Sequence, residues 1–144
     1  GKSMDMSILT PAAVLVLWSL IMLFWLAYAR FSAAAKLGNS EPVAPGLRGQ
    51  DIDPKLPPSA AWKSHNYAHL MEQPTIFYPT VFILFLTGTA TPVTVIMAWA
   101  YVILRIIHSV YQSTVNKVMV RFAIFLASTL CLLFLAVHAV LATI

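Results

Sequence analysis

Four apolar segments run along this chain, and their lengths predict membrane-spanning helices. They lie at about residues 8–29, 64–87, 92–111 and 117–143. A helix needs about 20 apolar residues to cross the hydrocarbon core of a bilayer. Backbone polar groups find no water there, so apolar segments of this length are expected to be helical. Because the later connections are short, the pattern predicts an all-α, antiparallel bundle of four transmembrane helices.

The middle of the chain carries no charged residue between Glu72 and Arg105. One break, Gly88 to Pro92, interrupts this apolar region. This region is too short for a hairpin of two spans, which needs about 40 apolar residues and a turn. Both helices must therefore extend past the charged residues, which places Glu72 and Arg105 within the membrane near the same surface. Ionisable residues are costly in that position and normally face a partner. We expect Glu72 and Arg105 to face each other.

The composition agrees with a membrane protein of one domain. The chain has 144 residues, of which 60% are hydrophobic and 10% are charged, whereas soluble domains carry about 25% charged residues. We interpret residues 1–3 as a remnant of cloning and residues 4–144 as a single membrane domain. Asp5 precedes the first span where a signal peptide has basic residues, so we expect that span to be retained. The net charge of +4 comes from cations beside apolar spans, which indicates membrane orientation and no nucleic-acid partner.

The long polar connection, about residues 31–63, is rich in proline and glycine, which predicts an irregular loop. Cations collect on its side of the membrane: Arg30, Lys36, Arg48, Lys55, Lys63, Lys117 and Arg121. Loops rich in Lys and Arg usually face the cytoplasm. We therefore predict a multi-pass protein with a cytoplasmic loop, both termini outside, and Glu72 and Arg105 near the cytoplasmic face.

Polar residues recur on the second and third helices at helical spacing. On the second helix the aligned residues are His65, His69 and Glu72, with Asn66 beside them. On the third helix they are Tyr101, Arg105, His108 and Gln112, with Tyr111 beside them. Residues at i, i+4 and i+7 lie on one face of a helix. If the two faces meet, they form a buried polar seam. An ion pair that only fixes helix register needs fewer hydrogen-bonding groups, so the seam predicts a pocket for a polar ligand.

Two further interpretations concern a possible metal site on the second helix and the role of Arg121. His65, His69 and Glu72 share a face and have the side chains of a divalent metal site. Arg121, one turn after Lys117, is either an ordinary membrane anchor or a cation that stabilises a bound thiolate or carboxylate.

The whole pattern resembles the MAPEG family, the membrane-associated proteins of eicosanoid and glutathione metabolism. The resemblance is carried by four helices of this length, a long first loop, Met71-Glu72, and Arg105 three residues before His108. The separations from Glu72 to Arg105 and from Arg105 to Arg121 are similar to those of prostaglandin E synthase-type members. The similarity extends over nearly the whole chain and is most specific in residues 65–125.

This resemblance implies a bacterial-type member in the inner membrane, forming a homotrimer with glutathione between subunits near the cytoplasmic face. Arg121 corresponds to the catalytic arginine that stabilises the glutathione thiolate, which is the nucleophile. Glu72 and Arg105 correspond to residues that hold the tripeptide. Other implied ligand-binding residues are Arg30, Asn66, His69, His108, Tyr111 and Gln112. The implied function is a glutathione-dependent transferase or peroxidase acting on lipophilic electrophiles that arrive from the lipid bilayer.

Some positions depart from the family pattern. Glutathione-binding members carry Arg-Asn where this chain has Ala68 and His69. Gln112 replaces an expected tyrosine, with Tyr111 adjacent, and Phe122 replaces the serine that follows the catalytic arginine. Part of the carboxylate clamp is therefore absent while the thiolate-stabilising arginine is present. The alternative functions are a non-enzymatic trimer that binds another anionic ligand or a lipid headgroup, and the metal site.

Overall fold

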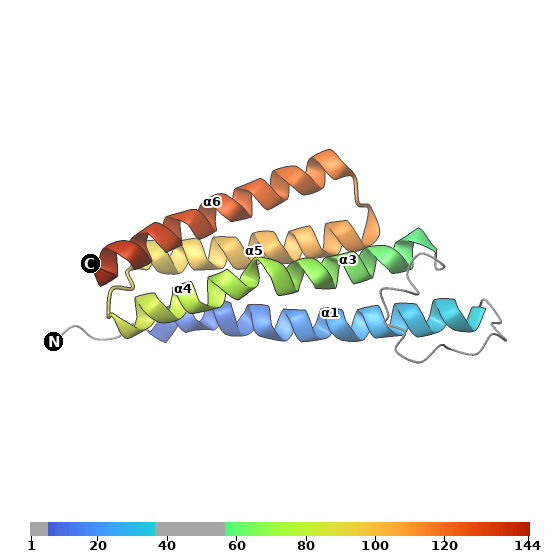
Figure 1. Ribbon diagram of the computed structural model, residues 1–144, viewed down its shortest axis with the longest axis horizontal. Coiled ribbons are helices and arrows are strands. Elements are labelled where there is room, and N and C mark those ends of the chain that lie inside the picture. The colour runs from blue at the N-terminus through green and yellow to red at the C-terminus, as the bar shows by residue number, and fades with distance from the viewer. Residues whose placement is uncertain (1–5, 37–56) are drawn as a thin grey trace.

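The computed structural model describes residues 6–36 and 57–144, which form four antiparallel helical rods (Figure 1). The elements, in order, are η1 (Met6–Ile8), α1 (Leu9–Lys36), α3 (Pro58–Glu72), α4 (Pro74–Leu86), α5 (Pro92–Thr114) and α6 (Val118–Thr143). Helices α3 and α4 follow each other in the second rod. No strand occurs in these two ranges, so the predicted all-α antiparallel bundle is confirmed.

Within the described ranges, three helical stretches are each long and apolar enough to cross a membrane. They are Met6–Ala33, Pro92–Thr114 and Val118–Thr143. The second rod does not meet the same length criterion, because it is divided into helices of 15 and 13 residues. The predicted single span over residues 64–87 is therefore two helices joined in line.

Proline explains both the start and the break of this rod. Pro58 lies in the first turn of α3, where its missing N–H costs nothing. Pro74 removes an N–H where the helix would otherwise continue, and a turn at Gln73 separates α3 from α4. Pro79 also lies inside α4, which continues through it. Because α3 begins at Pro58, the end of the predicted loop is helical.

The start of that loop is helical as well, since α1 continues to Lys36. Residues 37–56, the middle of the predicted loop, lie outside the described residues.

The short connection between α4 and α5 is fixed by local hydrogen bonds. Gly88 adopts φ 66°, and the N–H groups of Gly88 and Thr89 bond to the carbonyls of Phe85 and Leu84 at 3.1 Å each. A positive φ suits glycine at the C-terminal end of a helix. Thr91 then caps α5 by a reciprocal pair of hydrogen bonds with Thr94. The chain therefore reverses direction here, as the Gly-to-Pro break predicts.

Helix α5 occupies the centre of the bundle and packs against α1, α3 and α6. In the core of the bundle, the rings of Phe77 and Tyr101 stack with their centroids 4.5 Å apart, and both side chains are fully buried. Large apolar side chains such as Phe24, Leu86 and Met119 are exposed on the outside. An outer surface of this kind suits contact with lipid.

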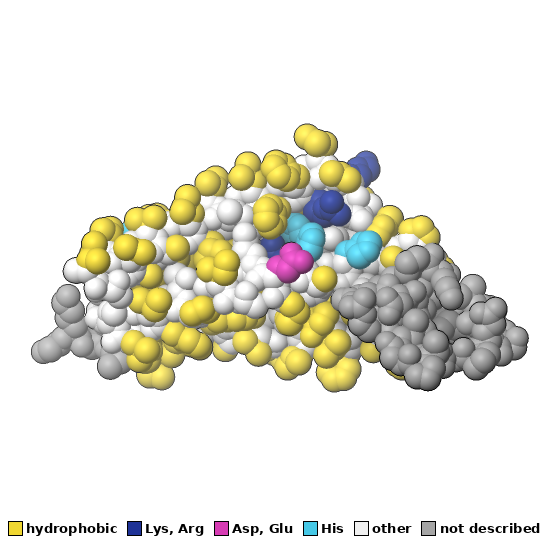
Figure 2. Space-filling model, in the orientation of Figure 1, with side chains coloured by type: hydrophobic (Ala, Val, Ile, Leu, Met, Phe, Trp, Pro, Cys, Tyr) yellow, Lys and Arg dark blue, Asp and Glu magenta, His cyan; other side chains and the backbone are white. Residues whose placement is uncertain are grey.

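Polar side chains are buried mainly at one end of α3 and α5. Figure 2 shows basic, acidic and histidine side chains gathered between α3 and the N-terminal half of α6, on a surface that is otherwise mostly apolar. The fold thus places its polar groups at the end where α5 connects to α6.

Candidate functional site

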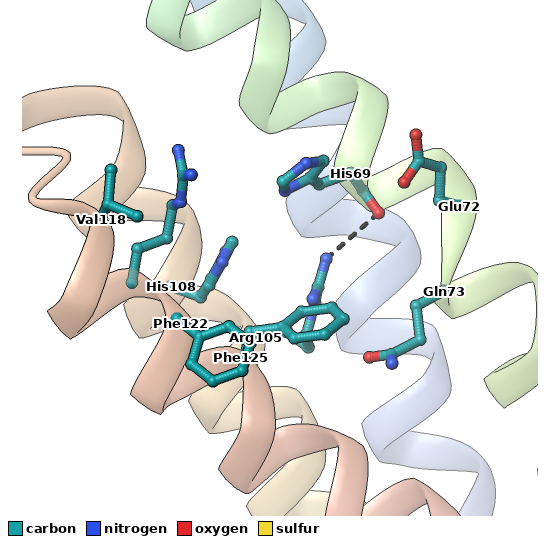
Figure 3. A pocket seen from close by; sticks show the side chains of 9 residues that line it. His69, Glu72, Gln73, Arg105, His108, Val118, Phe122 and Phe125 are labelled. Atoms are coloured by element: carbon teal, nitrogen blue, oxygen red, sulfur yellow. Dashed lines mark hydrogen bonds between the residues drawn. The ribbon is translucent and has the colours of Figure 1, made fainter.

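A cavity of about 270 Å³ lies between α3, α5 and α6. Its polar lining consists of His69, Glu72, Gln73, Arg105, His108 and Arg121. Its apolar lining consists of Val118, Phe122 and Phe125, all from the first two turns of α6 (Figure 3). Ligand sites typically combine an apolar wall with a few converging polar groups, and this cavity has that composition.

Gln73, in the break of the second rod, connects three helical rods at the cavity. Its Nε2 donates to Thr129 Oγ1 of α6 at 2.9 Å, and its Oε1 accepts from Tyr101 Oη of α5 at 3.1 Å. From this point toward its N-terminus α6 diverges from the second rod (Figure 1). The cavity lies beside the N-terminal half of α6. Gln73 therefore lies at the boundary between the part of α6 that packs against the second rod and the cavity.

Arg105 is a buried cation, with only 1% of its surface exposed. Its Nη2 donates to the backbone carbonyl of His69 at 3.1 Å, near the C-terminal end of α3. Helix C-terminal ends carry partial negative charge, and α3 ends here because of Pro74. Among the described residues, Nε and Nη1 of Arg105 have no hydrogen-bond partner. Buried N–H groups without partners are costly, so these donors favour an anionic ligand in the cavity.

The expected ion pair between Glu72 and Arg105 does not form. Glu72 is exposed, and its carboxylate points away from Arg105 in Figure 3. Arg105 instead uses the His69 carbonyl, because the end of α3 offers an acceptor closer than the Glu72 side chain. Both residues line the same cavity, with Glu72 at its rim and Arg105 at its base.

Two imidazoles stand beside this cation. His108 is 1% exposed, and its ring centroid lies 5.8 Å from that of the half-buried His69. Nδ1 of His69 is also buried and has no partner within residues 6–36 and 57–144. Two guanidinium groups, two imidazoles and one carboxylate give the lining a surplus of hydrogen-bond donors, which favours negatively charged ligands.

Arg121 reaches the cavity from α6. Its Nη1 donates to the side-chain oxygen of Asn116 at 2.8 Å, in the connection that precedes α6. The predicted catalytic arginine thus lies on the same cavity as Arg105, His108, His69 and Glu72.

Several predicted site residues do not line this cavity. Asn66 is 1% exposed, and its Oδ1 accepts from Ser109 Oγ at 2.6 Å, so it joins α3 to α5. Gln112 is equally buried and does not reach the cavity, although its Oε1 has no partner among the described residues. Tyr111 contributes its carbonyl to the end of α5. Asn66, Tyr111 and Gln112 thus lie outside the lining of this cavity, and their part in ligand binding stays a prediction.

Arg30 lies elsewhere, in a second cavity of about 420 Å³ between α1 and α3. Its Nη2 donates to Ser64 Oγ at 2.8 Å, and Tyr67 and Ala68 also line this space. Arg30 is therefore separate from the cavity that holds Arg105 and Arg121.

The predicted metal-binding set is not assembled. Across the described part of the chain, no three His, Cys, Asp or Glu side chains are placed to hold a metal ion. His65 is exposed and does not line the first cavity, so it does not converge with His69 and Glu72.

The sequence prediction did not include Gln73, Val118 and Phe125, and it noted Phe122 only as a departure from the family. Helical spacing contains the missing signal, because Val118, Phe122 and Phe125 lie at i−3, i+1 and i+4 from Arg121 on one side of α6. Gln73 is a polar residue directly before a helix-breaking proline, where a side chain is free to bridge neighbouring helices.

Comparison with known proteins agrees with the resemblance seen in the sequence. The sequence profile of the MAPEG family matches residues 8–141, which is nearly the whole chain. Neither the curated proteins nor the solved structures gave a significant match. Together with the helical bundle and its apolar spans, this match establishes that the chain is an integral membrane protein that belongs to the MAPEG family.

Proposed function

We propose that this protein is a membrane-bound, glutathione-dependent transferase or peroxidase that acts on lipophilic electrophiles. The observation that carries the proposal is the composition of the first cavity. A buried arginine with two nitrogens lacking partners in the described residues lies there beside a second arginine and a wall of phenylalanine. The family is associated with glutathione in general, which makes this tripeptide the first ligand to test.

The lining residues fit the charged groups of glutathione. The Nε and Nη1 donors of Arg105 lie on different edges of the guanidinium, so each can donate one hydrogen bond to an oxygen of an anionic ligand. Glu72, at the exposed rim, is suited to the ammonium group of the γ-glutamyl residue. The donors of the two histidines can bind the remaining peptide oxygens. In this arrangement Arg105 and Glu72 bind the two ends of an ionic ligand.

Arg121 would supply the catalytic charge. The thiolate, and not the thiol, is the nucleophile, and a nearby cation lowers the pKa of a bound thiol. The thiol proton leaves to solvent, and the sulfur then attacks the electrophile, forming a C–S bond as the leaving group departs with its electron pair. Phe122 and Phe125 provide the apolar surface on which a lipophilic acceptor can lie. Such an acceptor would enter from the bilayer.

We also propose that the functional unit is a homotrimer in the bacterial inner membrane, with the site near the cytoplasmic face and both termini outside. Arg30 supports this assembly, since it lines a separate cavity between α1 and α3 and does not reach the first cavity. A neighbouring subunit would bring its own Arg30 toward the cavity of the first. This would assemble the predicted ligand-binding residues that one subunit keeps apart.

The test is a glutathione titration of the purified protein in detergent. A ligand at 100 times its Kd stabilises the native state by about 2.7 kcal/mol, which corresponds to a rise in Tm of about 5–10 °C for a chain of this size. S-methylglutathione should raise Tm similarly, while only glutathione should give the ultraviolet absorbance of a thiolate. The proposal fails if Tm does not rise across a glutathione titration that extends into the millimolar range.

A second function is favoured by one specific observation. Ala68 replaces the family arginine, and Asn66 is engaged with Ser109, so the carboxylate clamp has fewer members. A non-enzymatic trimer that binds an anionic lipid headgroup fits the same cationic cavity. Stabilisation by glycerol phosphate with no response to glutathione would favour this function.

A further inference from the structure

The connection between α5 and α6 contains an unusual backbone conformation at Asn116. Among residues 6–36 and 57–144 it is the one non-glycine residue with a positive φ, 57°. Its N–H bonds to the carbonyl of Tyr111 at 2.9 Å and so closes the end of α5. Left-handed geometry is unfavourable for most residues, although asparagine tolerates it better than others. Glycine would serve this turn equally well, so the turn alone does not account for the amide side chain.

The side chain of Asn116 makes a second contact, which involves the proposed catalytic arginine. Its Oδ1 accepts from Arg121 Nη1 at 2.8 Å. Arginine has several rotatable bonds, and holding its guanidinium in one place costs rotamer entropy. The left-handed turn fixes Asn116 relative to α6, so the amide oxygen restricts the directions that the guanidinium can take. Arg121 lines the cavity in this orientation.

The amide side chain of Asn116 is neutral, so it accepts a hydrogen bond from Arg121 without compensating the charge of the guanidinium. An aspartate would accept the same hydrogen bond but would also compensate the positive charge that a thiolate requires. Glu72, the carboxylate on the cavity rim, forms no ion pair with Arg121 in the part of the chain that the structure describes. Asn116 therefore orients the cation while leaving its charge available to the ligand.

We propose that Asn116 is a positioning residue that aims the Arg121 guanidinium at the sulfur of bound glutathione. The proposal rests on the proposed glutathione function and adds a residue that acts only through Arg121. The other charged or titratable groups on the cavity are His69, Glu72, Arg105 and His108, and all of them stay unchanged in the experiment.

The experiment measures the pKa of the bound glutathione thiol from the pH dependence of thiolate absorbance at saturating glutathione. Asn116→Gly keeps the left-handed turn and removes the acceptor. We expect it to lower the thiolate fraction at neutral pH about three- to tenfold, because the cation is no longer held beside the sulfur. Asn116→Asp should lower it as well, because the carboxylate compensates the charge. Glutathione affinity should stay within about threefold of the wild type in both variants, since binding relies on Arg105 and Glu72.

Two controls separate a positioning role from a structural one. Lys117→Ala removes the adjacent exposed cation and should leave the thiol pKa unchanged. In an Arg121→Ala background, Asn116→Gly should have no further effect on the thiol pKa, because the group it orients is gone.

The outcomes are distinct. A wild-type thiol pKa in Asn116→Gly would overturn the proposal, as would an equal effect of this substitution with and without Arg121. A wild-type protein that binds no glutathione refutes the proposed function instead, and with it the role of Asn116.

Discussion

Replacing Arg105 with methionine tests whether the buried cation serves a ligand or the fold. Arg105 is 1% exposed and donates one hydrogen bond, from Nη2 to the His69 carbonyl at 3.1 Å. Its Nε and Nη1 find no partner in the described residues. Methionine is an unbranched, flexible side chain without donors, so it keeps much of the packing and removes the charge.

The expected change in stability is a balance of terms that nearly cancel. Losing the charge-assisted bond to His69 costs about 1.5–3 kcal/mol, and losing the interaction with the end of α3 costs about 0.3–2 kcal/mol. Removing two buried donors without partners in the described chain recovers about 1–3 kcal/mol for each. The substitution also removes the desolvation penalty of a buried charge, which adds further to the free energy of unfolding. We therefore expect the free energy of unfolding of Arg105→Met to be equal to the wild-type value or higher.

The assay is thermal unfolding in detergent with and without glutathione. Without ligand, Tm of Arg105→Met should equal or exceed the wild-type Tm, and the rise produced by glutathione should disappear. Arg121→Met is the matched control, since it removes the other cavity arginine and keeps Arg105. It should retain the rise in Tm and lose the thiolate absorbance. A ligand-binding role for Arg105 is refuted if Arg105→Met destabilises the protein by more than about 3 kcal/mol, a fall in Tm of about 6–12 °C, and the variant still responds to glutathione.

Three further substitutions test other parts of the structure. Asn66→Ala should lower stability by about 1–3 kcal/mol, because it leaves the buried Ser109 hydroxyl without its acceptor; its glutathione affinity should stay unchanged, and a loss of binding would return Asn66 to the ligand site. Gln73→Leu should lower Tm by removing two hydrogen bonds worth about 1 kcal/mol each; a wild-type Tm would contradict its bridging role. Phe122→Ser should raise KM for a lipophilic acceptor by about tenfold, through lost apolar contact, while KM for glutathione stays constant; equal changes in both would contradict the assigned wall.

Hydropathy predicts the four rods because the bilayer leaves the backbone no alternative to helix. It predicts their ends less well, since it reports the thickness of the apolar core and not the length of the helix. Helix α1 continues to Lys36 and α3 begins at Pro58 because polar sequence beyond an apolar span can remain helical.

The prolines show a second limit of predicting helix ends from the sequence. Pro58 and Pro74 each begin a helix, and Pro79 lies within one. Their effect depends on which groups replace the lost hydrogen bonds, and these are side chains nearby in the fold. At Pro74 the Thr75 hydroxyl bonds to the Glu72 carbonyl at 2.5 Å, and Gln73 bridges to α5 and α6.

The candidate site was predictable only as far as helical faces allow. His69, Glu72, Arg105 and His108 gather because they lie at one depth on adjacent helices. Asn66 lies three residues before His69 and is rotated away from it by about 60° around the helix. That rotation is enough to direct it to Ser109 and away from the cavity. Spacing along a helix identifies a stripe of polar residues, but the packing of the next helix decides which side of the stripe meets a ligand.

The hydrogen-bond partner of Arg105 is a feature that the sequence alone does not specify. The sequence contains two opposite charges at matching depth, and pairing them is the simplest solution for a buried cation. It does not show that a backbone carbonyl near the negative, C-terminal end of α3 lies within reach of Arg105. That carbonyl takes one donor of the guanidinium, and Glu72 stays at the exposed rim. Had the two side chains paired, they would have satisfied each other and left little charge for a ligand. Because Arg105 bonds to the His69 carbonyl and not to Glu72, its charge stays available for binding an anion.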